Sequence, residues 1–290
     1  MSKLKYIGRN KMKQDAIKSH DGIELHYAVT DIKEDKPWIA LIFPFGLKLD
    51  LATPFLQFFE PQYNVVVWET RSILEDSTRE VGKEEFSIEN HLSDMKTILD
   101  LFPSEKYIVV GYCSGAGIAL GAANRYPNLI NDLLLVHGEY TMLKLEECTT
   151  NFAREIDSLL SMAGKDESYL QSVFDKIKQE RLEETSNRPD GIDMPFTRLE
   201  FLRRHSANYL SYKANDFEHL AQWVPHKTLL MSGELDAQAN VESTKRIASL
   251  IPNAEVYIDP DADHYGLLRE DSNTLITIWN YLYGQQANAA

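Results

Sequence analysis

One short stretch of the chain has the residue pattern of a reactive site. The sequence IVVGYCSGAG, residues 108–117, leads from β-branched residues into a turn in which Gly111 and Gly115 flank Cys113. Small residues two places before and after a nucleophile allow a sharp strand-to-helix turn to close, with the reactive side chain at its tip. Ser114 falls one place too late, because a bulky tyrosine would then occupy the first small position. The pattern predicts Cys113 as the nucleophile.

A cysteine in such a turn has two interpretations. A lone cysteine is more often a small residue of the core than a nucleophile. At the start of a helix, however, the helix N-terminus and any nearby imidazolium favour the reactive thiolate. We therefore interpret Cys113 as catalytic, and we give the other cysteine, Cys148 in LEECTT, the structural interpretation.

The segments around this turn alternate between strand-like and helix-like patterns. Such alternation is typical of an α/β fold with a mostly parallel central sheet and helices on both faces. The expected strands are Ile23–Val29, Trp38–Phe43, Tyr63–Trp68, Tyr107–Val110, Leu133–Val136, Lys227–Met231 and Glu255–Ile258, and the expected helices lie near Leu51–Phe59, Ser87–Leu101, Gly115–Arg125, Val241–Leu250 and Asn273–Tyr283.

The alternation breaks once, between residues 143 and 225. This region lacks strand-like runs and is helical, charged and aromatic, with a turn or loop at SNRPDGIDMP. Both of its flanks return to the same sheet, so we expect a lid over the strand ends rather than an independent domain. The prediction is a core of residues 1–142 and 226–290 with a helical lid, or cap, of residues 143–225.

Composition and charge exclude several function classes. The net charge of -14 argues against a nucleic acid partner, because nucleic-acid binders concentrate Lys and Arg on one face. No apolar run approaches the roughly 18 residues needed to span a membrane, and no secretory signal is apparent, so we expect a cytoplasmic protein with reduced thiols and no membrane partner. The histidines and cysteines show no metal-ligand spacing, and we expect neither a metal nor another cofactor.

Together these features resemble the α/β-hydrolase superfamily over nearly the whole chain. The resemblance implies a triad in the order nucleophile, acid, histidine. KTLLMSGELD is similar to the strand and Gly-x-x-Asp segment of the family and places the acid at Asp236, with Glu234 as a less well-spaced alternative. AEVYIDPDADHYGLL is similar to the last strand and its loop, and places the histidine at His264, which on its own could be a solvated loop residue.

The resemblance also implies an oxyanion hole and a substrate site. The backbone N–H of Ser114 is expected to be one oxyanion donor. LIFPFGLKLD resembles the loop that supplies the second, which makes Leu47 the other N–H donor. His137 and Tyr140 in VHGEY follow a strand and would face the ligand-binding edge, although a satisfied core histidine is an equal alternative. The candidate substrate-binding residues are Phe45, Gly46, Tyr112, His137 and Tyr140.

A sulfur nucleophile favours a particular reaction. A cysteine that accepts an acyl group from a thioester forms another thioester, so the acyl group stays activated for onward transfer. We predict a thioesterase-like hydrolase or acyltransferase of a biosynthetic type, which takes a small-molecule acyl group, with coenzyme A or an acyl carrier protein as the candidate carrier. The alternatives are a carboxylester or lactone hydrolase and, in another class, a non-catalytic ligand-binding protein on this scaffold.

Overall fold

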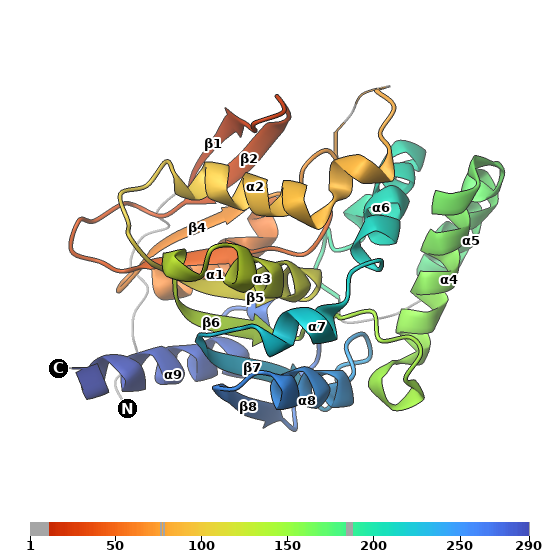
Figure 1. The fold of residues 1–290 in the computed structure, drawn as a ribbon. Coiled ribbons are helices and arrows are strands. Elements are labelled where there is room, and N and C mark those ends of the chain that lie inside the picture. The colour runs from red at the N-terminus through yellow and green to blue at the C-terminus, as the bar shows by residue number, and fades with distance from the viewer. Residues whose placement is uncertain (1–11, 76, 78, 184–187, 290) are drawn as a thin grey trace.

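The expected α/β architecture is confirmed. The computed structural model describes residues 12–75, 77, 79–183 and 188–289 (Figure 1). Within these residues an eight-stranded sheet has the order β1-β2-β4-β3-β5-β6-β7-β8, and the strands from β4 onward in that order pair in parallel. The strands are β1 (Lys13–Lys18), β2 (Glu24–Val29), β3 (Trp38–Ile42), β4 (Asn64–Trp68), β5 (Tyr107–Tyr112), β6 (Ile130–Val136), β7 (Lys227–Gly233) and β8 (Ala254–Asp259).

Strand β1 is the element that sequence analysis missed. Its residues, KQDAIK, are mostly exposed, and it pairs antiparallel with β2 at the edge of the sheet. An edge strand with little to bury carries no apolar pattern that would reveal it. The central strands β3, β4 and β5 are buried along their whole length, which explains why their β-branched and apolar runs were recognisable.

Helices cover both faces of the sheet. One buried cluster joins the sheet to α2, α3 and α8, which lie on its near face in Figure 1, and a second joins it to α1 and α9 on the other face. The bounds of these helices are α1 (Thr53–Phe59), α2 (Ile88–Leu99), α3 (Ser114–Arg125), α8 (Val241–Leu250) and α9 (Asn273–Ala289).

The predicted helical segment lies between β6 and β7. It contains α4 (Asn151–Lys165), α5 (Leu170–Glu183), α6 (Leu199–Tyr212) and α7 (Phe217–Gln222). The first three share an apolar cluster of their own, and in Figure 1 α4 and α5 stand at the side of the sheet away from both termini. Helix α7 instead packs with the core, because Phe217 and Ala221 belong to the cluster around α3. We refer to residues 143–225 as the inserted segment.

Arg204 ties the inserted segment to the core. Its side chain is buried, and its guanidinium donates to the carbonyls of Ser72 (2.9 Å), Ser77 (3.1 Å) and Arg79 (2.9 Å). It also pairs with the carboxylate of Glu75 at 3.0 Å. These bonds hold α6 against the loop that follows β4.

The neighbouring arginines do not join Arg204 in one basic site. Arg203 pairs with Glu167 at 2.6 Å on the surface, and the guanidinium of Arg198 lies over the ring of Phe201.

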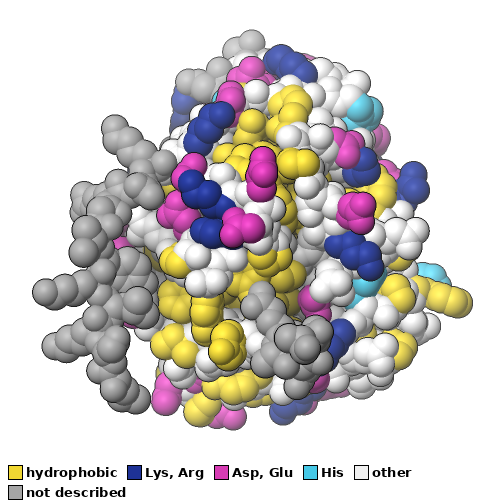
Figure 2. Space-filling model, turned by 90° about the vertical axis from the view of Figure 1, so that its left-hand side faces the viewer, with side chains coloured by type: hydrophobic (Ala, Val, Ile, Leu, Met, Phe, Trp, Pro, Cys, Tyr) yellow, Lys and Arg dark blue, Asp and Glu magenta, His cyan; other side chains and the backbone are white. Residues whose placement is uncertain are grey.

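The surface opposite the inserted segment is mixed in character. In Figure 2 hydrophobic side chains form a band down the middle of this face, and Lys, Arg, Asp and Glu side chains border it. Among the described residues, no helix has the length and apolar character that a membrane crossing requires.

Candidate active site

Cys113 occupies the tip of a strained turn between β5 and α3. Its backbone is in the left-handed region, with φ of 53°, and its N–H donates to the carbonyl of Val136 at 3.0 Å. A Cβ on Gly111 would lie 2.6 Å from the carbonyl oxygen of Gly115, and a Cβ on Gly115 would overlap the carbonyl oxygen of Ile42. The two glycines are therefore required where the sequence pattern places them, since any side chain would prevent the turn from closing.

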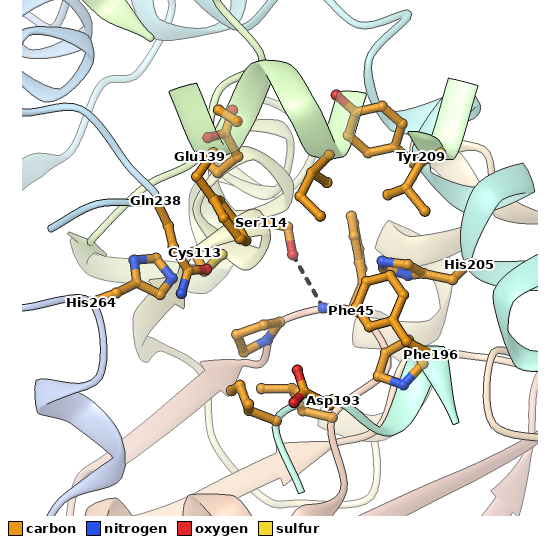
Figure 3. Close-up of a pocket in the computed structure, with 18 of the residues that line it drawn as sticks. Phe45, Cys113, Ser114, Glu139, Asp193, Phe196, His205, Tyr209, Gln238 and His264 are labelled. Carbon is orange, nitrogen blue, oxygen red and sulfur yellow. Dashed lines mark hydrogen bonds between the residues drawn. The ribbon is translucent and has the colours of Figure 1, made fainter. Parts of the chain in front are cut away.

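The three predicted triad residues meet at the carboxyl ends of β5, β7 and β8. Asp236 and His264 are buried, and His264 Nδ1 lies 2.9 Å from Asp236 Oδ2. Figure 3 shows the His264 ring beside Cys113 at one end of a cavity. Burial alone would lower the pKa of His264, but the hydrogen-bonded Asp236 carboxylate and the nearby Cys113 sulfur outweigh burial and raise the pKa well above its usual range. An imidazolium at this position can stabilise a thiolate.

Asp236 accepts four hydrogen bonds. Its Oδ1 accepts from the N–H groups of Gln238 (2.8 Å) and Ala239 (2.9 Å), and its Oδ2 accepts from two histidines. Burial opposes ionisation, but His264 and the donors around the carboxylate hold its pKa well below the usual range. The acid is therefore ionised and fixed in orientation.

The second histidine on Asp236 is His137. Its Nδ1 lies 2.9 Å from Asp236 Oδ2, its ring is buried, and its backbone has φ of 49°. An ionised carboxylate only accepts hydrogen bonds, so both Nδ1 atoms must carry protons and donate. His137 is thus a second hydrogen-bond donor to Asp236, in addition to His264. The sequence showed only a histidine at a strand end, and no spacing rule connects it to Asp236.

The same three residues offer a possible metal site by distance alone. Ligand atoms of His137, Asp236 and His264 lie within 4.8 Å of one another. Both ring Nδ1 atoms, however, point at one carboxylate oxygen at hydrogen-bond distance, and a protonated nitrogen has no lone pair for a metal. The donor set therefore fits a hydrogen-bonded triad better than a metal centre.

The predicted oxyanion donors lie on two elements that meet beside Cys113. Ser114 is the first residue of α3. The N–H groups in the first turn of a helix have no carbonyl oxygen one turn earlier to which they can donate a hydrogen bond. Its hydroxyl accepts from the N–H of Phe45 at 3.1 Å, the bond drawn in Figure 3, which joins α3 to the loop that carries Leu47. Gly46 has φ of 73°, and a Cβ there would overlap Pro195, so this loop also needs its glycine.

A cavity of about 160 Å³ lies between the triad and the inserted segment. Phe45, Leu47, Tyr112, Cys113, Ser114 and His264 line it, whereas Gly46, His137 and Tyr140 are not among its described lining residues. Tyr140 is buried and packs against Phe217. The inserted segment supplies most of the apolar part of the remaining wall: Phe152, Ala153, Ile156, Leu160, Ile192, Pro195 and Phe196.

Several polar lining residues were not predicted from the sequence. They include Glu139, which follows β6, Gln238, which follows β7, and Asp193, His205 and Tyr209 of the inserted segment. Glu139 lies in VHGEY, between the two residues that were selected there, and only the turn of the chain after β6 decides which of the three faces the cavity.

Comparison with known proteins identifies the fold family. The family model described as alpha/beta hydrolase fold matches residues 58–271, so the chain belongs to the α/β-hydrolase fold family. An L-allo-isoleucyltransferase from Pseudomonas savastanoi pv. glycinea is 27% identical over 180 residues, which cover 60% of this chain and 61% of that protein. The chain thus matches less than two thirds of this curated relative.

Solved structures share the fold at low identity. The enol-lactonase from Burkholderia xenovorans LB400 has a TM-score of 0.69 and 17% identity, over 93% of this chain and 100% of that one. A thermophilic esterase from Thermogutta terrifontis has a TM-score of 0.69 and 18% identity, over 94% and 98%. At such identities the similarity concerns the fold alone. The family and its relatives agree with the expectation of a hydrolase or acyltransferase.

Proposed function

We propose that this protein is an acyltransferase that carries its acyl group on Cys113 as a thioester. The observation that supports this most directly is a cysteine at the tip of the turn, next to a histidine (Figure 3) that is in turn hydrogen-bonded to a buried, ionised aspartate. This arrangement has the roles of a nucleophile, a general acid–base and an orienting acid.

The residues allow a balanced reaction in two steps. The Cys113 thiolate attacks the carbonyl carbon of a thioester, and the N–H groups of Ser114 and Leu47 stabilise the oxyanion. The carbon–sulfur bond to the leaving thiol then breaks, and His264 gives the leaving sulfur its proton. In the second step an acceptor loses its proton to His264, attacks the acyl carbon and releases the Cys113 thiolate.

Two features favour transfer over hydrolysis. Exchange between two thioesters is nearly balanced in energy, so the acyl group on Cys113 remains as reactive as in the donor. The similarity to an L-allo-isoleucyltransferase also supports transfer, and extends the proposal to an α-aminoacyl group with an apolar side chain. A mainly apolar cavity of about 160 Å³ suits such a side chain.

The inserted segment acts in this proposal as the lid. It contributes most of the apolar cavity wall, while the core contributes the reacting groups. A lid of this kind limits the access of water to the acyl-enzyme. In this proposal the donor and acceptor thiols belong to coenzyme A or to the arm of a carrier protein.

Intact-mass measurement tests the proposal. The protein is incubated with the N-acetylcysteamine thioester of L-isoleucine, and we expect a mass increase of one isoleucyl group on the wild type. Cys113→Ala should abolish the adduct, whereas Cys148→Ala, the matched control at the buried second cysteine, should retain it. A wild type that stays unmodified by any acyl thioester, or an adduct that survives in Cys113→Ala, would disprove the proposal.

A further inference from the structure

Glu139 places a carboxylate on the wall of the mainly apolar cavity, where the second carboxylate, that of Asp193, is paired with Arg188 at 3.5 Å. It lies in the turn after β6, lines the cavity together with Cys113, and its own N–H donates to the carbonyl of Cys113 at 3.2 Å. The hydroxyl of Tyr212 donates to the Glu139 carbonyl at 2.6 Å, so the backbone at this position is held from both sides. Figure 3 shows Glu139 on the wall near Cys113.

The side chain of Glu139 is only partly satisfied by the protein. Its Oε1 accepts from the N–H of Thr141 at 2.6 Å. Within the part of the chain that the structure describes, its Oε2 has no hydrogen-bond donor, and the carboxylate has no ion-pair partner. Glu139 is only partly exposed and lines the cavity, so its open oxygen is available to a cationic group of a ligand bound there.

The surroundings of Glu139 favour its protonated form in the free protein. Burial raises the pKa of Glu139 to about 7, and the Thr141 N–H offsets only part of that effect. The His264 cation lowers the pKa, and the Asp236 and Asp157 carboxylates raise it. Asp157 is itself paired with Lys213, so that lysine does not neutralise Glu139. The other ionisable groups facing Glu139 are the phenols Tyr140, Tyr209 and Tyr212.

This inference rests on the proposed function, because it concerns the acyl group that Cys113 accepts. We propose that Glu139 binds the α-ammonium group of an aminoacyl thioester whose carbonyl lies at Cys113 and whose side chain fills the apolar part of the cavity. The ammonium nitrogen of such a substrate is two bonds from the carbonyl carbon, so it must lie next to the nucleophile. Glu139 is the acidic cavity residue joined directly to Cys113 by a backbone hydrogen bond.

The inference makes the substrate class specific. A fatty or other simple acyl group would leave Glu139 without a partner, and a dicarboxylic acyl group would be repelled by it. An α-aminoacyl group with an aliphatic side chain satisfies both the carboxylate and the apolar wall. Electrostatic recognition of this kind discriminates strongly, because the wrong substrate leaves a polar group unpaired inside the site.

A pair of matched thioesters tests the role of Glu139. The N-acetylcysteamine thioesters of L-isoleucine and of 3-methylpentanoic acid have the same carbon skeleton and differ in the α-amino group. The second-order rate of Cys113 acylation is measured for each by intact mass. We expect the wild type to prefer the isoleucyl thioester, and Glu139→Gln to reduce this preference at least tenfold. Glu146→Gln, the same change at an exposed site outside the cavity lining, should keep the wild-type preference.

The outcomes separate the two proposals. If Glu139→Gln slows both thioesters equally, or leaves their ratio unchanged, Glu139 does not bind the ammonium group and this inference is wrong, while acylation of Cys113 stands. If the wild type accepts the 3-methylpentanoyl group as well as the isoleucyl group, the inference is also wrong. If neither thioester modifies the wild type, the proposed function itself fails.

Discussion

Tyr112 and His264 are joined by a hydrogen bond although 152 positions separate them in the chain. The buried hydroxyl of Tyr112 donates to the backbone carbonyl of His264 at 2.7 Å, and the two rings pack with centroids 5.6 Å apart. Tyr112 directly precedes Cys113. The residue before Cys113 therefore positions the loop that carries His264, and the bond links the proposed nucleophile to the proposed general acid–base.

Tyr112→Phe should weaken this link. The change leaves the His264 carbonyl buried without its donor, so we expect a loss of about 1 to 2 kcal/mol in unfolding free energy. We also expect a several-fold slower acylation of Cys113. Tyr107→Phe is the matched control, because Tyr107 makes the same kind of bond, to the carbonyl of Leu99 at 2.9 Å, away from the cavity. Its stability should fall similarly while its acylation rate stays at the wild-type value. Equal acylation rates in the two variants would contradict the link.

Cys113→Ser should convert a transfer catalyst into one that stops at the acyl-enzyme. A serine ester is more stable than a thioester, so return of the acyl group to a thiol acceptor becomes unfavourable. We expect transfer to a thiol to fall by at least about 100-fold, by analogy with the loss of other nucleophiles. Mass spectrometry should show whatever ester forms persisting for longer than the wild-type thioester. A serine variant that transfers at the wild-type rate would exclude a special role for sulfur.

His137 should act as a positioning residue for Asp236. Removing its N–H donor by His137→Leu should reduce kcat for transfer by about 10- to 100-fold with little change in KM, because the triad acid loses one of its four hydrogen bonds. His137→Asn retains a donor, and asparagine tolerates the positive φ of this position. We expect it to recover most of the activity. If both variants lose the same fraction of kcat, the role of His137 is in folding alone, which denaturant unfolding would reveal.

Glu139 should make the free protein less stable as the pH rises. Its pKa is raised from 4.5 to about 7 in the folded state, so between these values the unfolded chain has released a proton that the folded chain still holds. The resulting penalty is absent at low pH, grows through this window and is constant above it. Glu139→Gln should therefore match the wild type at about pH 4 and be more stable by about 1 to 3 kcal/mol at about pH 8. Urea unfolding at both pH values measures this, and a pH-independent difference would contradict it.

Arg204→Met should detach the inserted segment from the loop after β4. The loss of the buried guanidinium leaves the carbonyls of Ser72, Ser77 and Arg79 without their donor, and we expect a cost of about 2 to 4 kcal/mol. The adjacent Arg203→Met provides the control. Its exposed pair with Glu167 should contribute less than about 1 kcal/mol. Thermal or urea unfolding of the two variants checks the difference, which should be absent if Arg204 is only a surface charge.

The sequence predicts those parts of the molecule that depend on local rules. The glycines around Cys113 are required by the geometry of a single turn, and the central strands β3, β4 and β5 are recognisable because they are buried along their whole length. Strand β1 forms only because β2 offers it a partner, so its own residues carry no signal.

The candidate site likewise contains residues that local sequence patterns predict and residues whose contacts depend on the folded chain. Asp236 and His264 could be placed because each follows a strand in a recognisable segment. The contacts of His137 with Asp236 and the position of Glu139 on the cavity wall depend on how separate turns meet in space, and no residue spacing encodes them.

The way the inserted segment is attached to the sheet determines which of its parts can vary in length and sequence. The segment leaves the sheet after β6 and returns at β7, and these two strands pair directly along their length. The helices α4 and α5, which pack in a cluster of their own, can therefore vary in length and sequence without disturbing the ends of these strands, whereas Arg204 and α7 tie the rest of the segment to the core. Chimaeras that exchange α4 and α5 between relatives are expected to change the acyl preference while Cys113, Asp236 and His264 stay in place.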